Sequence, residues 1–412
     1  MKIRLAIVVL LTFIIISCDA QKNNLDYFIN QAVVNSPLIK DYQNQILSGF
    51  YDSLQLRAAY KPQVMASSVN SYAPVIKGYG YDPVITNGGA LNAVVGVNKE
   101  LVFNKSITAQ IKSIQLANLS AANSAKLSEQ DLKKTIITQY ITAYGDLLQF
   151  NFNKQVDSLL TNEDAILKKL TQKNVYKQVD YLAFLVTLQQ QNLLTRQLSI
   201  QYQNDYATLN YLSGIMDTSL YDLEKPAIDI QELSLLENPF LIKQFEIDSL
   251  KLINSKTLID INYRPKINLY ADAGYNSAID FTSYKNFGTS FGISAIIPIY
   301  DGKQRKIQYN KIAIQEKTRE NYKSFLIKQY SQQTILLKRE LQSLRELERD
   351  IAQQEKYSES LIITNNKLLQ TGEVRISDYI LSLNGYLNVK NLIAQNNINQ
   401  LQIINQINYR NR

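Results

Sequence analysis

Alternating apolar and polar residues mark two segments of the chain as β-hairpins. Between positions 266 and 275 every second residue is apolar and the residues between them are mostly polar, and 288–300 repeats this alternation. Successive side chains of a strand point to opposite faces, so the pattern predicts strands with one apolar face. Residues 89–103 show a similar pattern, and hairpins are therefore predicted at 62–103 and 265–300. The alternation alone fits a membrane barrel and a soluble sandwich equally.

After each hairpin the pattern changes to that of an α-helix. Residues 303–370 contain no Gly or Pro, and apolar residues there and in 105–173 form stripes suited to coiled-coil packing. At 1.5 Å per residue, roughly 67 residues make rods of about 100 Å. Shorter helices are predicted to follow at 178–212 and 377–409, and others to precede the hairpins at 24–59 and 231–261.

The chain repeats this order of elements once. Pro62 and Pro265, which precede the two hairpins, are 203 positions apart, and Asp180 and Asp378, which follow the two long helices, are 198 apart. We therefore predict a first structural repeat over 21–212 and a second over 231–412, joined by a connector at 213–230. Gly (14) and Pro (8) are scarce, which agrees with a chain of few turns and long elements.

The first 20 residues read as an export signal. Lys2 and Arg4 precede an apolar run that is too short for a transmembrane helix. Two cleavage sites are compatible with the sequence. Cleavage before Cys18 would make that residue the lipidated start of the mature chain, whereas cleavage after Ala20 would leave no lipid.

Composition argues against an enzyme and against nucleic-acid binding. The chain has no His and one Cys, and no Ser or Cys lies in a pattern that suggests a nucleophile with its base. A single Cys gives neither a disulfide framework nor a thiolate metal site, and no cofactor is expected. The net charge of +8 is spread along the helices, as on a solvated helical surface.

Three motifs, taken in order and spacing, resemble those of the TolC family of outer-membrane efflux ducts. "PIYDGKQRK" at 298–306 is similar to the family's strand-to-helix junction, "TGEVRISDYI" at 371–380 to its helix turn, and "LNYLSGI" at 209–215 to the end of its first half. The first-half turn, "KNVYKQVDYL", departs from the family because it lacks the turn glycine. The resemblance covers essentially the whole mature chain.

The resemblance implies a mainly α fold with a β-barrel portion. Each of three identical chains would give four strands to a twelve-stranded barrel in the outer membrane of a Gram-negative bacterium, and its long helices to a tunnel in the periplasm. The implied function is the exit duct of a tripartite efflux system for small molecules. Its partners would be outer-membrane lipids, a periplasmic adaptor and an inner-membrane pump of the RND or ABC type. The alternative is the outer-membrane component of a type I protein or peptide secretion system.

The resemblance also places candidate site residues at the two helix turns, which we call the tips. Asp180 and Asp378 would each form a ring of three carboxylates at an aperture, or would serve only as first-turn carboxylates or caps of their helices. Tyr181 and Tyr379 would pack the tips or act in the gate. The candidates for adaptor contact are Val175, Tyr176, Val179, Gly372, Glu373, Val374, Arg375 and Ser377. The strand residues expected to face lipid are Val95, Val97, Leu269, Phe291, Ile293 and Ile297.

Overall fold

The computed structural model describes residues 24–82, 89–231, 239–278 and 285–411, and the expected export segment with Cys18 lies outside them. The chain forms two compact units, each assembled from separate stretches of sequence. Unit 1 comprises Met1–Lys40, Ala125–Phe240 and Phe325–Arg412, and unit 2 comprises Asp41–Ser124 and Leu241–Ser324.

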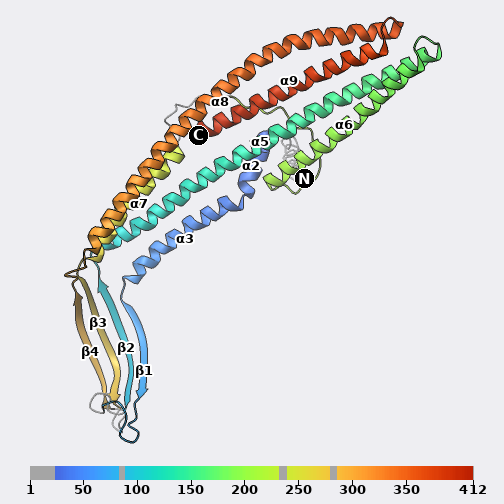
Figure 1. Cartoon of the computed structure of the whole chain (residues 1–412). Helices are drawn as coiled ribbons and strands as arrows, with labels where there is room; N and C mark the ends of the chain where they lie inside the picture. The colour runs from blue at the N-terminus through green and yellow to red at the C-terminus, as the bar shows by residue number, and fades with distance from the viewer. Residues whose placement is uncertain (1–23, 83–88, 232–238, 279–284, 412) are drawn as a thin grey trace, which may run out of the picture. The chain divides into compact units, whose positions relative to one another are not determined.

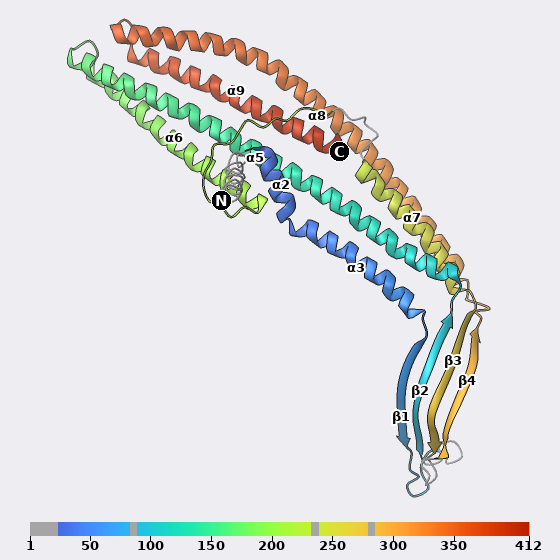
Figure 2. The ribbon, with the colours of Figure 1, turned by 180° about the vertical axis from the view of Figure 1, so that it is seen from behind.

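Unit 2 contains a four-stranded antiparallel sheet in which sequence order is also spatial order. The strands are β1 (Gln63–Tyr72), β2 (Gly89–Leu101), β3 (Lys266–Ala278) and β4 (Phe287–Ile296). The two predicted hairpins are therefore confirmed, and β2 and β3 join them into one sheet (Figure 1). Within the described residues β1 pairs only with β2 and β4 only with β3, so both lie at the edges of the sheet in both views (Figures 1 and 2).

The strand register separates an apolar face from a polar face. Val97 lies opposite Ala271, which lies opposite Phe291, and the next row on this face contains Leu269 and Ile293. Residues in register share a face, so five of the six residues predicted to face lipid lie on the same side of the sheet. The other face carries the rows Gly96–Asp272–Ser290 and Glu100–Asn268–Ser294.

The sixth residue, Ile297, was predicted to lie in a strand, and this is wrong. β4 ends at Ile296, and Ile297 begins the irregular segment that contains Pro298. Proline has no amide hydrogen to donate to a strand ladder and restricts the residue before it, which explains why pairing stops there.

Unit 2 also contains most of α3 (Pro37–Ala59) and of α7 (Pro239–Asn262), and the first parts of the two long helices. The structure gives the long helices as α5 (Asn104–Gln172) and α8 (Gln304–Thr371), close to the prediction. They are followed by α6 (Gln178–Ser213) and α9 (Ile376–Asn411), as predicted. The start of the helix expected at 231–261 falls largely on residues outside those described.

The helix predicted at 24–59 is in fact two helices. α2 (Leu25–Asn35) ends at Ser36, whose backbone is extended, and α3 begins at Pro37. A proline disfavours helical geometry in the residue before it but suits the first position of a helix. The Ser36 hydroxyl then accepts a hydrogen bond from the Ile39 amide, as an N-cap does.

Unit 1 buries two main groups of side chains. One core lies at the tips and is built by α5, α6, α8 and α9. A second, rich in aromatic rings, includes Phe28 of α2, Tyr140 of α5 and Tyr206 of α6, whose rings meet edge to face. Within the described part of the chain, no helix has both the length and the apolar character that a membrane crossing needs.

Candidate functional site at the helix tips

Each tip is closed by the same hydrogen-bonded turn. In the second tip Gly372 is left-handed (φ 83°), the Glu373 amide donates to the Leu368 carbonyl at 2.9 Å, and the Gly372 amide donates to Leu369 at 3.3 Å. These two bonds are the Schellman motif, in which a left-handed residue ends the helix. The glycine type at this position is thereby explained.

In the first tip Asn174 takes the place of the missing glycine. Its φ is 59°, the Val175 amide donates to Leu170 at 3.0 Å, and the Asn174 amide donates to Thr171 at 3.0 Å. Asn174 and Gly372 are 198 positions apart, the same offset as Asp180 and Asp378. The sequence did contain the signal, because Asn is the non-glycine residue that most readily adopts this conformation at a helix end.

Tyr176 joins the two tips from inside. It is 9% exposed, and its hydroxyl lies 2.8 Å from the Leu369 carbonyl oxygen and 3.0 Å from that of Val374. The prediction that Tyr176 is an adaptor contact is therefore wrong. Its ring is buried because the second tip covers it, which is a tertiary contact that local sequence does not show.

Tyr181 and Tyr379 belong to the same core. The Tyr181 hydroxyl donates to Asp164 at 3.0 Å, whereas the Tyr379 side chain is 0% exposed and its hydroxyl has no hydrogen-bond partner among the described residues. Burial raises the pKa of Tyr379 well above its usual range. This geometry favours packing over gating for both tyrosines.

Asp180 and Asp378 are the third residues of α6 and α9, and both side chains are exposed. The N-cap of α6 is Lys177, which makes no side-chain capping bond. The Asp180 amide donates to the Lys177 carbonyl and the Asp378 amide to that of Arg375. Neither aspartate is thus the N-cap residue, although both lie in the first turn, where the helix dipole favours negative charge.

The remaining tip candidates form an exposed surface, which we call the tip surface. It contains Val175, Val179, Glu373, Arg375 and Ser377, with Val179 73% exposed. Gly372 and Val374 are half-buried beside it. A Cβ on Gly372 would come within 2.7 Å of Val175 Cγ1, so close packing as well as backbone conformation favours glycine there.

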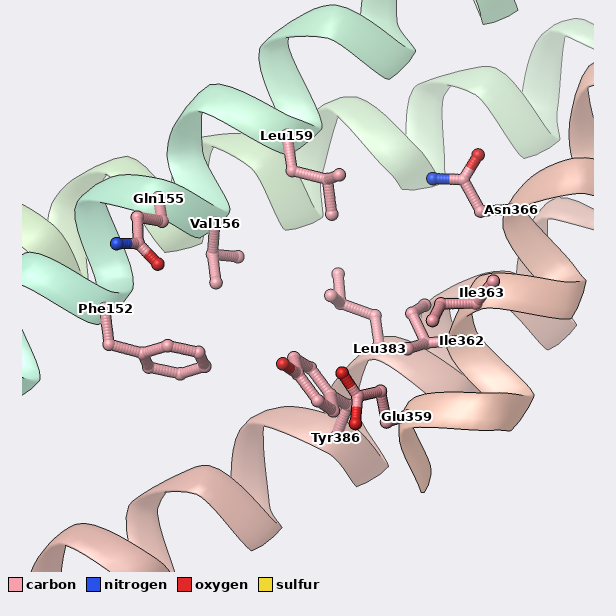
Figure 3. Close-up of a pocket in the computed structure, with 10 residues that line it drawn as sticks. All are labelled: Phe152, Gln155, Val156, Leu159, Glu359, Ile362, Ile363, Asn366, Leu383 and Tyr386. Atoms are coloured by element: carbon pink, nitrogen blue, oxygen red, sulfur yellow. The ribbon is translucent and has the colours of Figure 1, made fainter. Parts of the chain in front are cut away.

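A groove behind the tips was not predicted from the sequence (Figure 3). Its volume is about 250 Å³, and it is lined by Phe152, Gln155, Val156 and Leu159 of α5, by Glu359, Ile362, Ile363 and Asn366 of α8, and by Leu383 and Tyr386 of α9. The rings of Phe152 and Tyr386 meet edge to face at 6.1 Å. The groove lies between helices that are far apart in the sequence, so no local pattern could reveal it.

A buried carboxylate lies nearer the tips on the same helices. Glu163 of α5 is 4% exposed and accepts a hydrogen bond from Gln370 of α8 at 3.4 Å. Burial raises the pKa of this carboxyl group. The bond links the two helical hairpins, α5–α6 and α8–α9, within the tip core.

Comparisons with known proteins bear on the fold. No protein-family model matches the chain, and no curated protein matches its sequence. Among solved structures, it resembles the outer membrane protein VceC from Vibrio cholerae, with TM-score 0.73 and 12% identity over 94% of this chain and 96% of that one. It also resembles the Campylobacter jejuni CmeC outer membrane channel (TM-score 0.73, 12% identity, 94% and 85%). A third similar structure is the Neisseria gonorrhoeae MtrE outer membrane channel in its open state. Its TM-score is 0.73 and its identity 11%, over 94% of this chain and 88% of that one.

The agreement extends over nearly the whole length of each protein, so it concerns the sheet and the long helices together. The sequence-based resemblance is confirmed at the level of the fold. This chain has the TolC-like fold of outer-membrane channel proteins.

Proposed function

We propose that the protein is the outer-membrane exit duct of a tripartite efflux system in a Gram-negative bacterium. Its sheet would lie in the outer membrane and its helices in the periplasm. The sheet supports this proposal because one of its faces is apolar and the opposite face is polar. A strand between lipid and an aqueous lumen needs these two faces. The fold shared with structures described as outer membrane channels supports it too.

The observation that carries the proposal is the pair of free sheet edges. β1 and β4 each have one unpaired side in the described residues, and because the four strands alternate in direction, β4 of one copy can continue antiparallel onto β1 of the next. Four strands cannot close on themselves, whereas three copies supply twelve. The proposed duct is therefore a homotrimer around a closed barrel.

The helices of unit 1 support assembly independently. Exposed apolar residues follow one side of α6 at intervals of three, four and seven: Val179, Leu182, Val186, Leu193 and Ile200. One side of α8 carries another exposed set: Leu336, Leu347, Tyr357 and Leu361. Stripes with this spacing are typical of coiled-coil contacts, and a neighbouring copy would cover them.

In such a trimer Asp180 and Asp378 would each occur three times, which supports an aperture lined by carboxylates. The tip surface and the groove of Figure 3 are the proposed docking region for the periplasmic adaptor. Exposed Val175 and Val179 with an apolar groove behind them suit the apolar side of a partner helix. The pump behind that adaptor would be of the RND or ABC type.

The test is assembly and conduction by the purified protein. We expect light scattering, with the detergent's mass subtracted, to give three chains per particle, and the same sample to form ion-conducting pores in a planar bilayer. A particle of one chain would refute the shared barrel. A trimer without conductance would refute the duct.

A further inference from the structure

Basic residues gather where the sheet of unit 2 meets its helices. In the segments 57–61, 99–105, 260–266 and 301–306 there are nine basic residues and three acidic ones. The basic residues, which we call the basic collar, are Arg57, Lys61, Lys99, Lys105, Arg264, Lys266, Lys303, Arg305 and Lys306. The hairpin ends of the same strands, 73–88 and 277–288, have two basic and two acidic residues. Positive charge is thus concentrated at one end of the sheet.

The three acidic residues of these segments, Glu100, Asp260 and Asp301, leave the nine basic residues with an excess of six positive charges (9 − 3). The Asp260 carboxylate forms an ion pair with Arg305 and accepts a hydrogen bond from the Tyr309 hydroxyl. Asp301 accepts from the backbone amides of Lys303 at 2.9 Å and Arg305 at 2.7 Å, so it holds the start of α8. Among the described residues, Arg305 is the one collar residue with a carboxylate within 4.0 Å. The lysines of the collar are all exposed.

Aromatic rings lie among these cations. The guanidinium of Arg264 is 5.8 Å from the ring centre of Phe103, and that of Arg305 is 5.6 Å from Tyr263. Phe103 is exposed and follows β2 by two residues. Aromatic residues with amphipathic surroundings at the end of an apolar strand are typical of the boundary between hydrocarbon and head groups.

Lys99 connects the collar to the apolar face. It stands opposite Leu269, which stands opposite Ile293, so it is on the apolar side, one row from the end of the β2–β3 ladder at Leu101. A lysine there can lay its carbon chain along apolar surface and place its ammonium group at a bilayer surface. A cation at the border of this mainly apolar face therefore fits the surface of a bilayer.

From this arrangement we propose that the basic collar binds the phosphate groups of anionic phospholipids in the periplasmic leaflet. The inference rests on the proposed membrane function and adds a lipid class to it. Lysine ammonium groups bind phosphate as point charges, and each basic residue near an anionic surface adds to the attraction. The hairpin ends of the strands carry no excess of basic residues. The preference for anionic phospholipid is therefore assigned to the leaflet next to the helices, which is the periplasmic one.

The experiment measures lipid retained by the full-length protein. The protein is reconstituted with equal amounts of phosphatidylglycerol and phosphatidylcholine, washed with detergent, and its retained lipid counted by mass spectrometry. We expect phosphatidylglycerol to be enriched on the order of fivefold. The enrichment should fall when salt is raised from about 0.1 M to about 1 M, because the screening length shortens from about 10 Å to about 3 Å.

Two variants matched in charge locate the effect. Lys99→Gln/Lys303→Gln/Lys306→Gln removes three collar charges, and Lys77→Gln/Lys338→Gln/Lys356→Gln removes three exposed charges elsewhere. We expect the first to lose most of the enrichment and the second to keep it. Equal retention of both lipids by the wild type, or equal loss in both variants, overturns the inference. A wild type that retains neither lipid overturns the proposed membrane function itself, and a collar variant that keeps its full enrichment overturns the collar's role.

Discussion

Asp146 of α5 lies beside Asp205 of α6 within unit 1, close enough for the Asp205 charge to oppose ionisation of Asp146. The Asp146 side chain is 6% exposed, Gln201 donates to its Oδ1 at 3.1 Å, and Gln139 donates to Asp205 at 3.0 Å. Burial and the neighbouring negative charge both disfavour the ionised form of the Asp146 carboxyl group.

We expect Asp146 to make the stability of unit 1 depend on pH. Burial, and after it the neighbouring Asp205 carboxyl group, raises the pKa of Asp146 to about 7. An unfolded Asp loses its proton near pH 4, so between about pH 4 and 7 the folded state binds the extra proton and stability falls as pH rises. We expect thermal unfolding, followed by circular dichroism, to occur at lower temperature at pH 8 than at pH 5.5.

Asp146→Asn provides the control for that prediction. An amide keeps the shape of the side chain and can still accept from Gln201, but it does not titrate. Much of the pH dependence should therefore disappear, and the variant should match or exceed the wild type at pH 8. An unchanged pH profile in Asp146→Asn would show that other carboxyl groups cause it.

The two tip turns should respond differently to substitution. Gly372→Ala places a Cβ on a left-handed residue and 2.7 Å from Val175 Cγ1, so we expect it to lower the stability of unit 1 by about 1–2 kcal/mol. Asn174→Gly keeps the left-handed turn and should change it by less than about 0.5 kcal/mol. Denaturant unfolding measures both, and equal losses would contradict the assigned turns.

The two faces of the sheet should tolerate charge unequally. Ile293 and Ser294 are adjacent in β4 but stand on opposite faces. An arginine on the lipid side of a barrel costs about 2–4 kcal/mol at mid-membrane, so Ile293→Arg should reduce the yield of heat-resistant trimer more than Ser294→Arg does. Equal yields from the two variants, compared by gel electrophoresis without boiling, would mean that the faces are assigned wrongly.

Charge at the tips should set ion preference. Asp378→Asn removes a carboxylate that is exposed and is not the N-cap, so the helix should remain intact. If the three copies line an aperture, conductance in a planar bilayer should lose cation preference and sensitivity to divalent cations added on the periplasmic side.

The double variant Asp180→Asn/Asp378→Asn should enhance this loss. Selectivity that stays the same in both variants would leave these carboxylates with only their local role at the start of α6 and α9. The amount of trimer serves as the control, since it should not change.

Sequence periodicity was sufficient for the long elements of this fold. Residues 303–370 could form little other than a helix, and alternation at 266–275 gave both the strand and its apolar side. All six residues predicted to face lipid were assigned from alternation of this kind, and the strand register places five of them on one side of the sheet.

Periodicity did not predict what depends on contact between distant residues. Tyr176 was predicted to be an exposed turn residue, but the second tip covers it. Its hydroxyl donates to the carbonyl oxygens of Leu369 and Val374, which are far from it in the sequence. The groove beside Phe152 and Tyr386 has the same origin. The break at Ser36 and the end of β4 have instead a local cause in the sequence, because Pro37 and Pro298 mark them directly.

The two open edges of the sheet have a consequence for how the protein matures. In the part of the chain that the structure describes, the outer edges of β1 and β4 have no partner strand and lie beside an apolar face, which is a template for mispairing with an extended chain. If closure needs neighbours, folding and assembly become one reaction, and its midpoint shifts with protein concentration. Newly exported copies would then depend on a holding chaperone, and dilution would be as damaging to them as heat.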